Sequence, residues 1–112
     1  MITIVFVLVA IAGGCLASHV WKGKLAPWWM SVAHGLIGAV ALLLLVVSVI
    51  ANRDDMPNMV IPLGIFLATG LSGFYLASLH ARQLVASHGV VIAHVGAALA
   101  GIGTLAAVLV GV

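Results

Sequence analysis

Residues 28–50 read WWMSVAHGLIGAVALLLLVVSVI, an apolar run without a charged side chain. A helix of about 20 apolar residues, rising ~1.5 Å per residue, covers the ~30 Å hydrocarbon core of a bilayer. The run is long enough for one passage, and Pro27 stands just before it, where the missing N–H of a proline costs a helix little. This stretch therefore predicts a membrane-spanning helix.

Working outward from this run, three more apolar runs follow the same pattern and are separated by short polar connections. The four runs occupy residues 2–20, 28–50, 60–79 and about 84–110. Connections this short force neighbouring helices to be antiparallel. We therefore expect an all-α integral membrane protein, a four-helix up-down bundle in which residues 1–112 form a single transmembrane domain.

The composition of the whole chain excludes several other classes of protein. Of the 112 residues, 65% are hydrophobic and 5% are charged, whereas a soluble domain carries about a quarter charged residues. An apolar chain with one cysteine is neither disordered nor a disulfide-stapled secreted module. A net charge of +2 is too small to support a nucleic-acid surface. We expect membrane lipid, and no nucleic acid, as a partner.

The few charged residues indicate an orientation. Lys22, Lys24 and Arg82 lie in the first and third connections, whereas the second holds both acids of the chain beside Arg53. Because cytoplasmic loops of membrane proteins carry an excess of Lys and Arg, we expect the first and third connections in the cytoplasm. Both termini would then lie outside it, and a bacterial inner membrane is the expected location.

Two pairs of similar segments indicate an internal repeat. Leu-Ala-Ser leads to a histidine at the end of the first and third runs, and His-Gly occurs near the start of the second and fourth. We therefore expect two copies of one helical hairpin, related as parallel repeats. This alignment pairs His34 with His88 and His19 with His80.

The five histidines are nearly as numerous as the charged residues, and the expected topology gathers them into the cytoplasmic half of the membrane. Counted along the helix axis, His19 and His80 lie within about 5 Å of the charged boundary. His34 and His88 lie about 9 Å inside it, and His94 about 18 Å, near the bilayer centre. An ionisable group inside the membrane is functional by default, whereas one at the interface can be solvated or cap a helix.

Imidazole ligates haem iron while it remains neutral, so lipid holds it at less cost than a charge. A bis-histidine haem needs two imidazoles on facing helices at matching depth, with small residues beside them to admit the flat macrocycle. Small residues do accompany the histidines, since Gly35 and Gly38 follow His34, and Gly73 precedes His80. We therefore expect a small b-type haem protein that transfers electrons.

All five histidines are candidate cofactor ligands: His19, His34, His80, His88 and His94. The expected central pair is His34 with either His88 or His94, and a second haem b would join His19 and His80. The architecture resembles that of four-helix membrane cytochromes b in general. No motif of these proteins matches closely enough to assign a role to a residue of this chain. A haem protein of this size implies a membrane redox partner or further copies of the chain.

Two other functions stay open on the sequence. A copper or zinc site for transport or sensing would use His34, His88 and His94. Its helpers would be the sulfur-containing residues Cys15, Met56 and Met59. A third possibility is a structural subunit, because small residues at every fourth position from Gly89 to Gly101 are typical of close helix packing in membranes.

Overall fold

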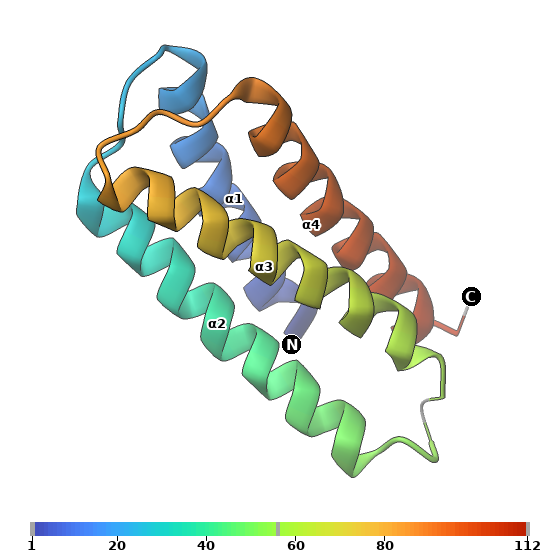
Figure 1. The fold of residues 1–112 in the computed structure, drawn as a ribbon. Helices are drawn as coiled ribbons and strands as arrows, with labels where there is room; N and C mark the ends of the chain where they lie inside the picture. The colour runs from blue at the N-terminus through green and yellow to red at the C-terminus, as the bar shows by residue number, and fades with distance from the viewer. Residues whose placement is uncertain (1, 56, 112) are drawn as a thin grey trace.

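The computed structural model describes residues 2–55 and 57–111, and these residues are organised as helices joined by short connections (Figure 1). The helices are α1 (Ile2–Trp21), α2 (Trp28–Ala51), the short 3-10 helix η1 (Pro57–Met59), α3 (Val60–Ala81) and α4 (His88–Leu109). Each of the four α-helices is long and apolar enough to cross a membrane. The prediction of four such helices is confirmed.

Helix α4 begins later than the sequence predicts, at His88 instead of residue 84. Gln83 adopts a left-handed conformation with φ of 59°, and a left-handed residue turns the chain away from the axis of the preceding helix. Ser87 then caps α4, since its side chain accepts a hydrogen bond from the backbone N–H of Val90 at 3.4 Å. His88 is consequently the first residue of α4 and lies at the helix end.

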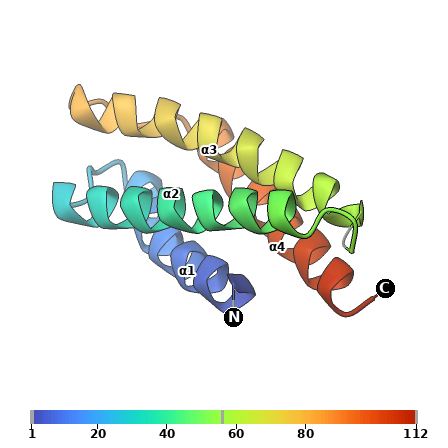
Figure 2. The same cartoon turned by 90° about the horizontal axis from the view of Figure 1, so that it is seen from below.

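Each α-helix packs against two others: α1 against α2 and α4, and α3 against α2 and α4. The two termini and the segment between α2 and α3 lie toward one end of the molecule, and the other two connections lie at the opposite end (Figures 1 and 2). The molecule measures 45 × 21 × 19 Å along its principal axes. Its length is close to the ~40–45 Å thickness of a bilayer with its headgroups.

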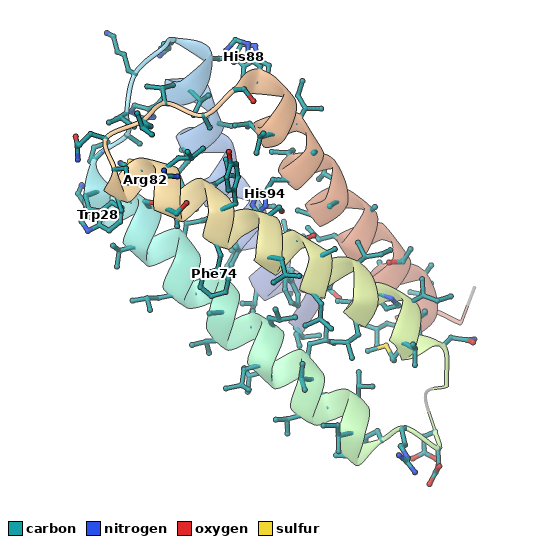
Figure 3. The ribbon with its side chains drawn as sticks, viewed as in Figure 1. Trp28, Phe74, Arg82, His88 and His94 are labelled. Atoms are coloured by element: carbon teal, nitrogen blue, oxygen red, sulfur yellow. The ribbon has the colours of Figure 1, made fainter. Side chains whose placement is uncertain are left out.

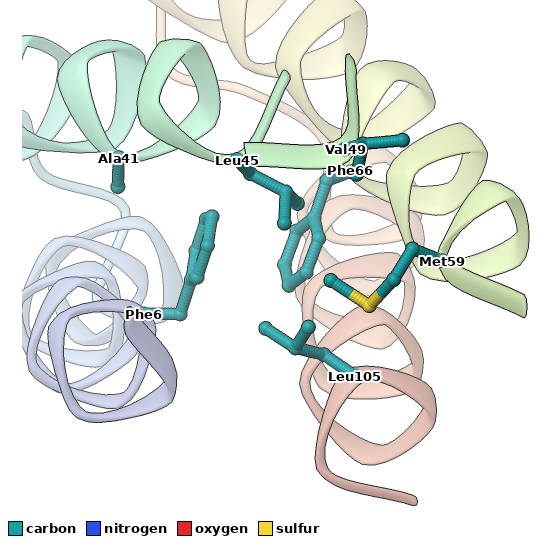
Figure 4. Packing of buried hydrophobic residues seen from close by; sticks show 7 residues of the cluster. All are labelled: Phe6, Ala41, Leu45, Val49, Met59, Phe66 and Leu105. Carbon is teal, nitrogen blue, oxygen red and sulfur yellow. The ribbon is translucent and has the colours of Figure 1, made fainter. Parts of the chain in front are cut away.

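Buried side chains concentrate toward the end that carries the termini. We call them the packed cluster: Phe6, Ala41, Leu45, Val49, Met59, Phe66 and Leu105 (Figure 4). Phe6 of α1 stacks on Phe66 of α3, with ring centroids 4.1 Å apart and ring planes 15° apart. Gly101 of α4 admits the Phe66 ring, because a Cβ there would lie 2.8 Å from Cε1 of that ring. The packed cluster therefore joins all four α-helices.

Candidate functional site

Two histidines meet inside the bundle, His34 from α2 and His94 from α4. The centroids of their rings are 6.3 Å apart, and the ring planes make an angle of 75°. Both side chains are half-buried, and Figure 3 shows His94 among the helices while His88 lies at the end of α4. Since α2 and α4 both pack against α1 and α3, the two rings meet across the bundle.

Each of the two rings lies against a glycine of a neighbouring helix. A Cβ on Gly13 of α1 would lie 2.9 Å from Cε1 of His34, and a Cβ on Gly73 of α3 would lie 3.1 Å from Cε1 of His94. Real Cβ atoms avoid such distances, so both glycines make room for imidazole rings. The sequence predicts Gly73 behind His80 as part of a haem slot, whereas in the structure Gly73 makes room for the ring of His94.

The hydrogen bond to Nδ1 of His34 determines which nitrogen of this ring carries the proton. Nδ1 lies 3.0 Å from the backbone carbonyl oxygen of Val9 in α1. A carbonyl oxygen can only accept, so Nδ1 carries the hydrogen and donates it. In the neutral ring, Nε2 then presents a free lone pair. A metal-ligating histidine typically has this second hydrogen bond through its other nitrogen.

His94 is held in a related way, through a side chain. Its Nδ1 lies 2.8 Å from the hydroxyl oxygen of Ser72 in α3. The Ser72 hydroxyl donates its one hydrogen to the backbone carbonyl of Thr69 at 2.8 Å. The hydroxyl must therefore accept from Nδ1 of His94, and Nε2 of His94 also presents its lone pair. Within the described residues, Nε2 of neither ring takes part in a hydrogen bond.

The other three histidines lie apart from this pair and have partners of their own. His88 is exposed, and its ring stacks on Trp21 with centroids 4.2 Å apart. His80 donates from Nε2 to the carbonyl oxygen of Ala26 at 3.0 Å, which ties the end of α3 to the connection before α2. His19 donates from Nδ1 to the carbonyl oxygen of Cys15, one turn back along α1, at 2.8 Å. These contacts are those of histidines that complete helix ends.

The structure thus brings His34 to His94 and not to His88, and it does not join His19 to His80. The reason is the register: Trp28 and His88 are both first residues of their helices and stand 60 positions apart, as do His34 and His94. The predicted repeat aligns the two His-Gly dipeptides instead, although the sequence also carries a signal for the register seen in the structure.

That signal is a spacing of 60 residues that relates many identical or similar positions. The related pairs include Phe6 with Phe66, Gly13 with Gly73, His34 with His94, and Leu45 with Leu105. Members of each pair have similar surroundings: Leu45 and Leu105 are both fully buried, and both glycines contact a histidine ring. A search for this spacing would have found the two glycines, which the sequence analysis did not connect with His34 and His94.

The sulfur-containing helpers proposed for a copper or zinc site do not surround the pair. Cys15 is exposed on α1, and Met59 is buried in the packed cluster. Met56 lies outside the described residues. Within residues 2–55 and 57–111, the structure gathers no group of three or more His, Cys, Asp or Glu side chains that could hold a metal ion.

Two cavities open between helices elsewhere on the bundle. One of about 360 Å³ lies between α1 and α4 and is lined by Ala17, Trp21, Val91, Ile92, Val95, Gly96 and Leu99. The other, of about 230 Å³, lies between α1 and α2 and is lined by Val5, Leu36, Ile37, Val40, Ala41 and Leu44. Neither lining contains a histidine, so neither cavity belongs to the site.

The candidate site is therefore a pair of imidazoles, seated on glycines and anchored through Nδ1, with both Nε2 lone pairs available. Such a pair can supply two nitrogen ligands to one metal centre inside the bundle. Comparison of the chain with protein-family models, with curated proteins and with solved structures finds no match.

Proposed function

We propose that this chain is a small integral-membrane protein that holds one haem b between His34 and His94 and transfers electrons. The observation that carries the proposal is the pair of anchored rings with free Nε2 atoms. These two imidazoles would be the residues that hold the haem iron. The centroids of His34 and His94 are 6.3 Å apart.

The number of ligands favours haem over a bare metal ion. The porphyrin itself supplies the remaining nitrogen ligands of haem iron, so two imidazoles complete the coordination. A structural zinc ion typically takes four protein ligands, and among the described residues only His34 and His94 converge here. Haem iron held in this way supplies one-electron transfer.

The surroundings of the pair differ between its two sides. Toward the termini, the stacked rings of Phe6 and Phe66 occupy the interior. Toward the opposite end, Leu16 of α1 and Leu76 of α3 are half-buried, one turn from the glycines that seat the rings. We propose that Leu16 and Leu76 would contact the haem from this second side and exclude water from it.

We further propose that the chain is an up-down bundle of two repeated helical hairpins, related by the spacing of 60 residues. Two observations support it beyond the sequence identities. The residues that end α1 and α3 adopt the same left-handed conformation at related positions, Gly23 with φ of 71° and Gln83 with φ of 59°. Related side chains also meet across the bundle, as in the stack of Phe6 on Phe66 and the pair of imidazoles.

The proposed orientation follows the positive charges. Lys22, Lys24 and Arg82 lie in the connections at the histidine end of the bundle, and we propose that this end faces the cytoplasm of a bacterium with both termini outside. The chain has little outside the membrane, so a redox partner would contact it within the bilayer or at these brief connections.

The test is the visible spectrum and the haem content of the full chain purified in detergent from haem-replete cells. We expect one haem per chain and an absorption band that sharpens on reduction. His34→Ala and His94→Ala should each lower haem content at least about tenfold. Loss of a group that only supports a metal ligand already lowers metal affinity by about that factor, so loss of the ligand itself should cost at least as much. His19→Ala and His88→Ala are the matched controls and should retain haem.

Three outcomes would contradict the proposal. Unchanged haem content in both His34→Ala and His94→Ala would remove the ligand assignment. Colourless protein with stoichiometric copper or zinc would replace haem by a metal ion, and Cys15→Ser would then ask whether the thiol contributes. Protein without any cofactor would leave a structural subunit as the remaining interpretation.

A further inference from the structure

The two candidate ligands are anchored by different groups at related positions. In the first half of the chain, the carbonyl oxygen of Val9 accepts directly from Nδ1 of His34 at 3.0 Å. In the second half, the related carbonyl belongs to Thr69, 60 residues on; it accepts from the Ser72 hydroxyl and also lies within reach of the His94 ring. The position related to Ser72 is Ala12, which has no hydroxyl. The second half of the chain therefore has a hydroxyl group at this position, and the first half lacks one.

A hydroxyl group differs from a carbonyl in that it can donate as well as accept. If the Ser72 hydroxyl donated to Nδ1 of His94, that ring would carry its proton on Nε2, and Nε2 would have no lone pair for a metal. The carbonyl oxygen of Thr69 prevents this, because it takes the only hydrogen of the hydroxyl at 2.8 Å. The hydroxyl oxygen is then left to accept from His94 at 2.8 Å.

We infer that Ser72 is a positioning residue that holds His94 in the tautomer with a free Nε2, while His34 relies on a backbone carbonyl for the same purpose. The inference rests on the proposed function, since a free Nε2 has a use only if the ring binds a metal. It makes the two ligands inequivalent: the proton of His94 is held by a side chain with the Thr69 carbonyl beside it, whereas that of His34 is held by the Val9 carbonyl alone.

The test measures the tautomers of the histidine rings by ¹⁵N NMR, in the full chain labelled at histidine and held without cofactor in detergent micelles. The wild-type chain should show the proton on Nδ1 for both His34 and His94. In Ser72→Ala, the ratio of the Nε2–H to the Nδ1–H form of His94 should rise about two- to tenfold, the worth of one net hydrogen bond. The ratio for His34 should stay unchanged.

Further variants distinguish the effect of the Ser72 hydroxyl group from the effect of the volume of its side chain. Ser72→Thr keeps the hydroxyl and Ser72→Val removes it with nearly the same shape, so the first should keep the wild-type tautomer and the second should lose it. Ser78→Ala is the matched control on the same helix, because that hydroxyl bonds to the carbonyl of Tyr75 and not to a histidine. It should leave both rings unchanged.

The inference is overturned if His94 of the wild-type chain carries its proton on Nε2, or if the Thr and Val variants give the same tautomer. The second result would mean that the Thr69 carbonyl fixes the proton of His94 by itself, as the Val9 carbonyl does for His34. Both results are read without haem, so they are distinct from a failure of the chain to bind haem. In haem-loaded protein, Ser72→Val should shift the reduction potential, and Ser72→Thr should leave it near the wild-type value. The reason is that the group bonded to the other nitrogen of a ligating imidazole tunes the basicity of the ring.

Discussion

The two ends of the bundle are built from the same helices and are packed with different side chains. Toward the termini, aromatic and aliphatic side chains fill the interior, and Phe6 stacks on Phe66 across it. Toward the other end, the rings that meet are those of His34 and His94, and their neighbours are half-buried. If the histidine pair binds haem as proposed, packing and cofactor binding are separated along the bundle axis, and substitutions at one end should spare the property of the other.

The largest change in stability is expected from a substitution that disrupts the packed cluster. Phe66→Ala removes a buried ring that contacts both Phe6 and the backbone of Gly101, and we expect it to lower the free energy of unfolding by about 3–5 kcal/mol. The measurement is denaturation of the chain in mixed micelles. Phe74→Ala, at a site that is 75% exposed, is the control and should change the same free energy by less than about 0.5 kcal/mol.

The haem affinity of Phe66→Ala tests whether the packed cluster and the histidine pair are independent of each other. The folded fraction of Phe66→Ala should bind haem with near wild-type affinity. Loss of haem binding without loss of stability would show that the packed cluster forms part of the site and would remove the distinction between the two ends.

The next effect is expected at the histidine end. Gly13→Ala adds a methyl group 2.9 Å from Cε1 of His34, and the ring cannot easily retreat because its Nδ1 is bonded to Val9. We expect the affinity for haem to fall about 10- to 100-fold, the range found when the support of a ligand is disturbed. Haem titration of the purified chain provides the measurement.

The neighbouring glycine offers a closely matched control. A Cβ on Gly14 would have nothing within 4 Å, so Gly14→Ala should leave haem affinity unchanged. It should also stabilise α1 by about 0.5–1 kcal/mol, since alanine favours a helix over glycine. Equal losses of affinity in the two variants would mean that the contact between Gly13 and His34 does not matter for binding.

The smallest expected effect concerns the start of α4. Ser87→Ala removes the cap that accepts from the N–H of Val90, and we expect it to cost about 1 kcal/mol of unfolding free energy. Haem content should stay at the wild-type level, because His94 lies nearly two turns further along the helix. Ser18→Ala is the control, as that exposed hydroxyl bonds to the carbonyl of Cys15 within α1. A loss of haem in Ser87→Ala would show that the helix start sets the position of His94.

Much of the fold could be predicted from the chain because lipid selects for length and apolarity. Three of the four predicted runs agree with the helices to within two residues at each end. The fourth prediction began four residues early, since residues 84–87 are as apolar as a helix but follow the left-handed Gln83. Hydropathy does not detect such a turn. The local signal for the start of α4 was the capping residue Ser87.

The candidate site was predictable only in part. His34 and His94 were both among the expected ligands, yet the sequence analysis left His88 as an equal choice for the partner of His34. The anchors Val9 and Ser72, and the seats Gly13 and Gly73, were not assigned to these rings. Each of these groups belongs to a different helix from the ring that it supports.

Charge and hydropathy act locally, so the amino-acid sequence alone predicts four helices that are long and apolar enough to cross a membrane and that carry the histidines. Only the tertiary structure decided which histidines meet and which nitrogen of each ring is free. Those properties depend on the rotation of each helix against its neighbours, which is set by contacts such as a ring on a glycine and a hydroxyl between an imidazole and a carbonyl. Such contacts join residues that are far apart in the chain, and no local pattern specifies them.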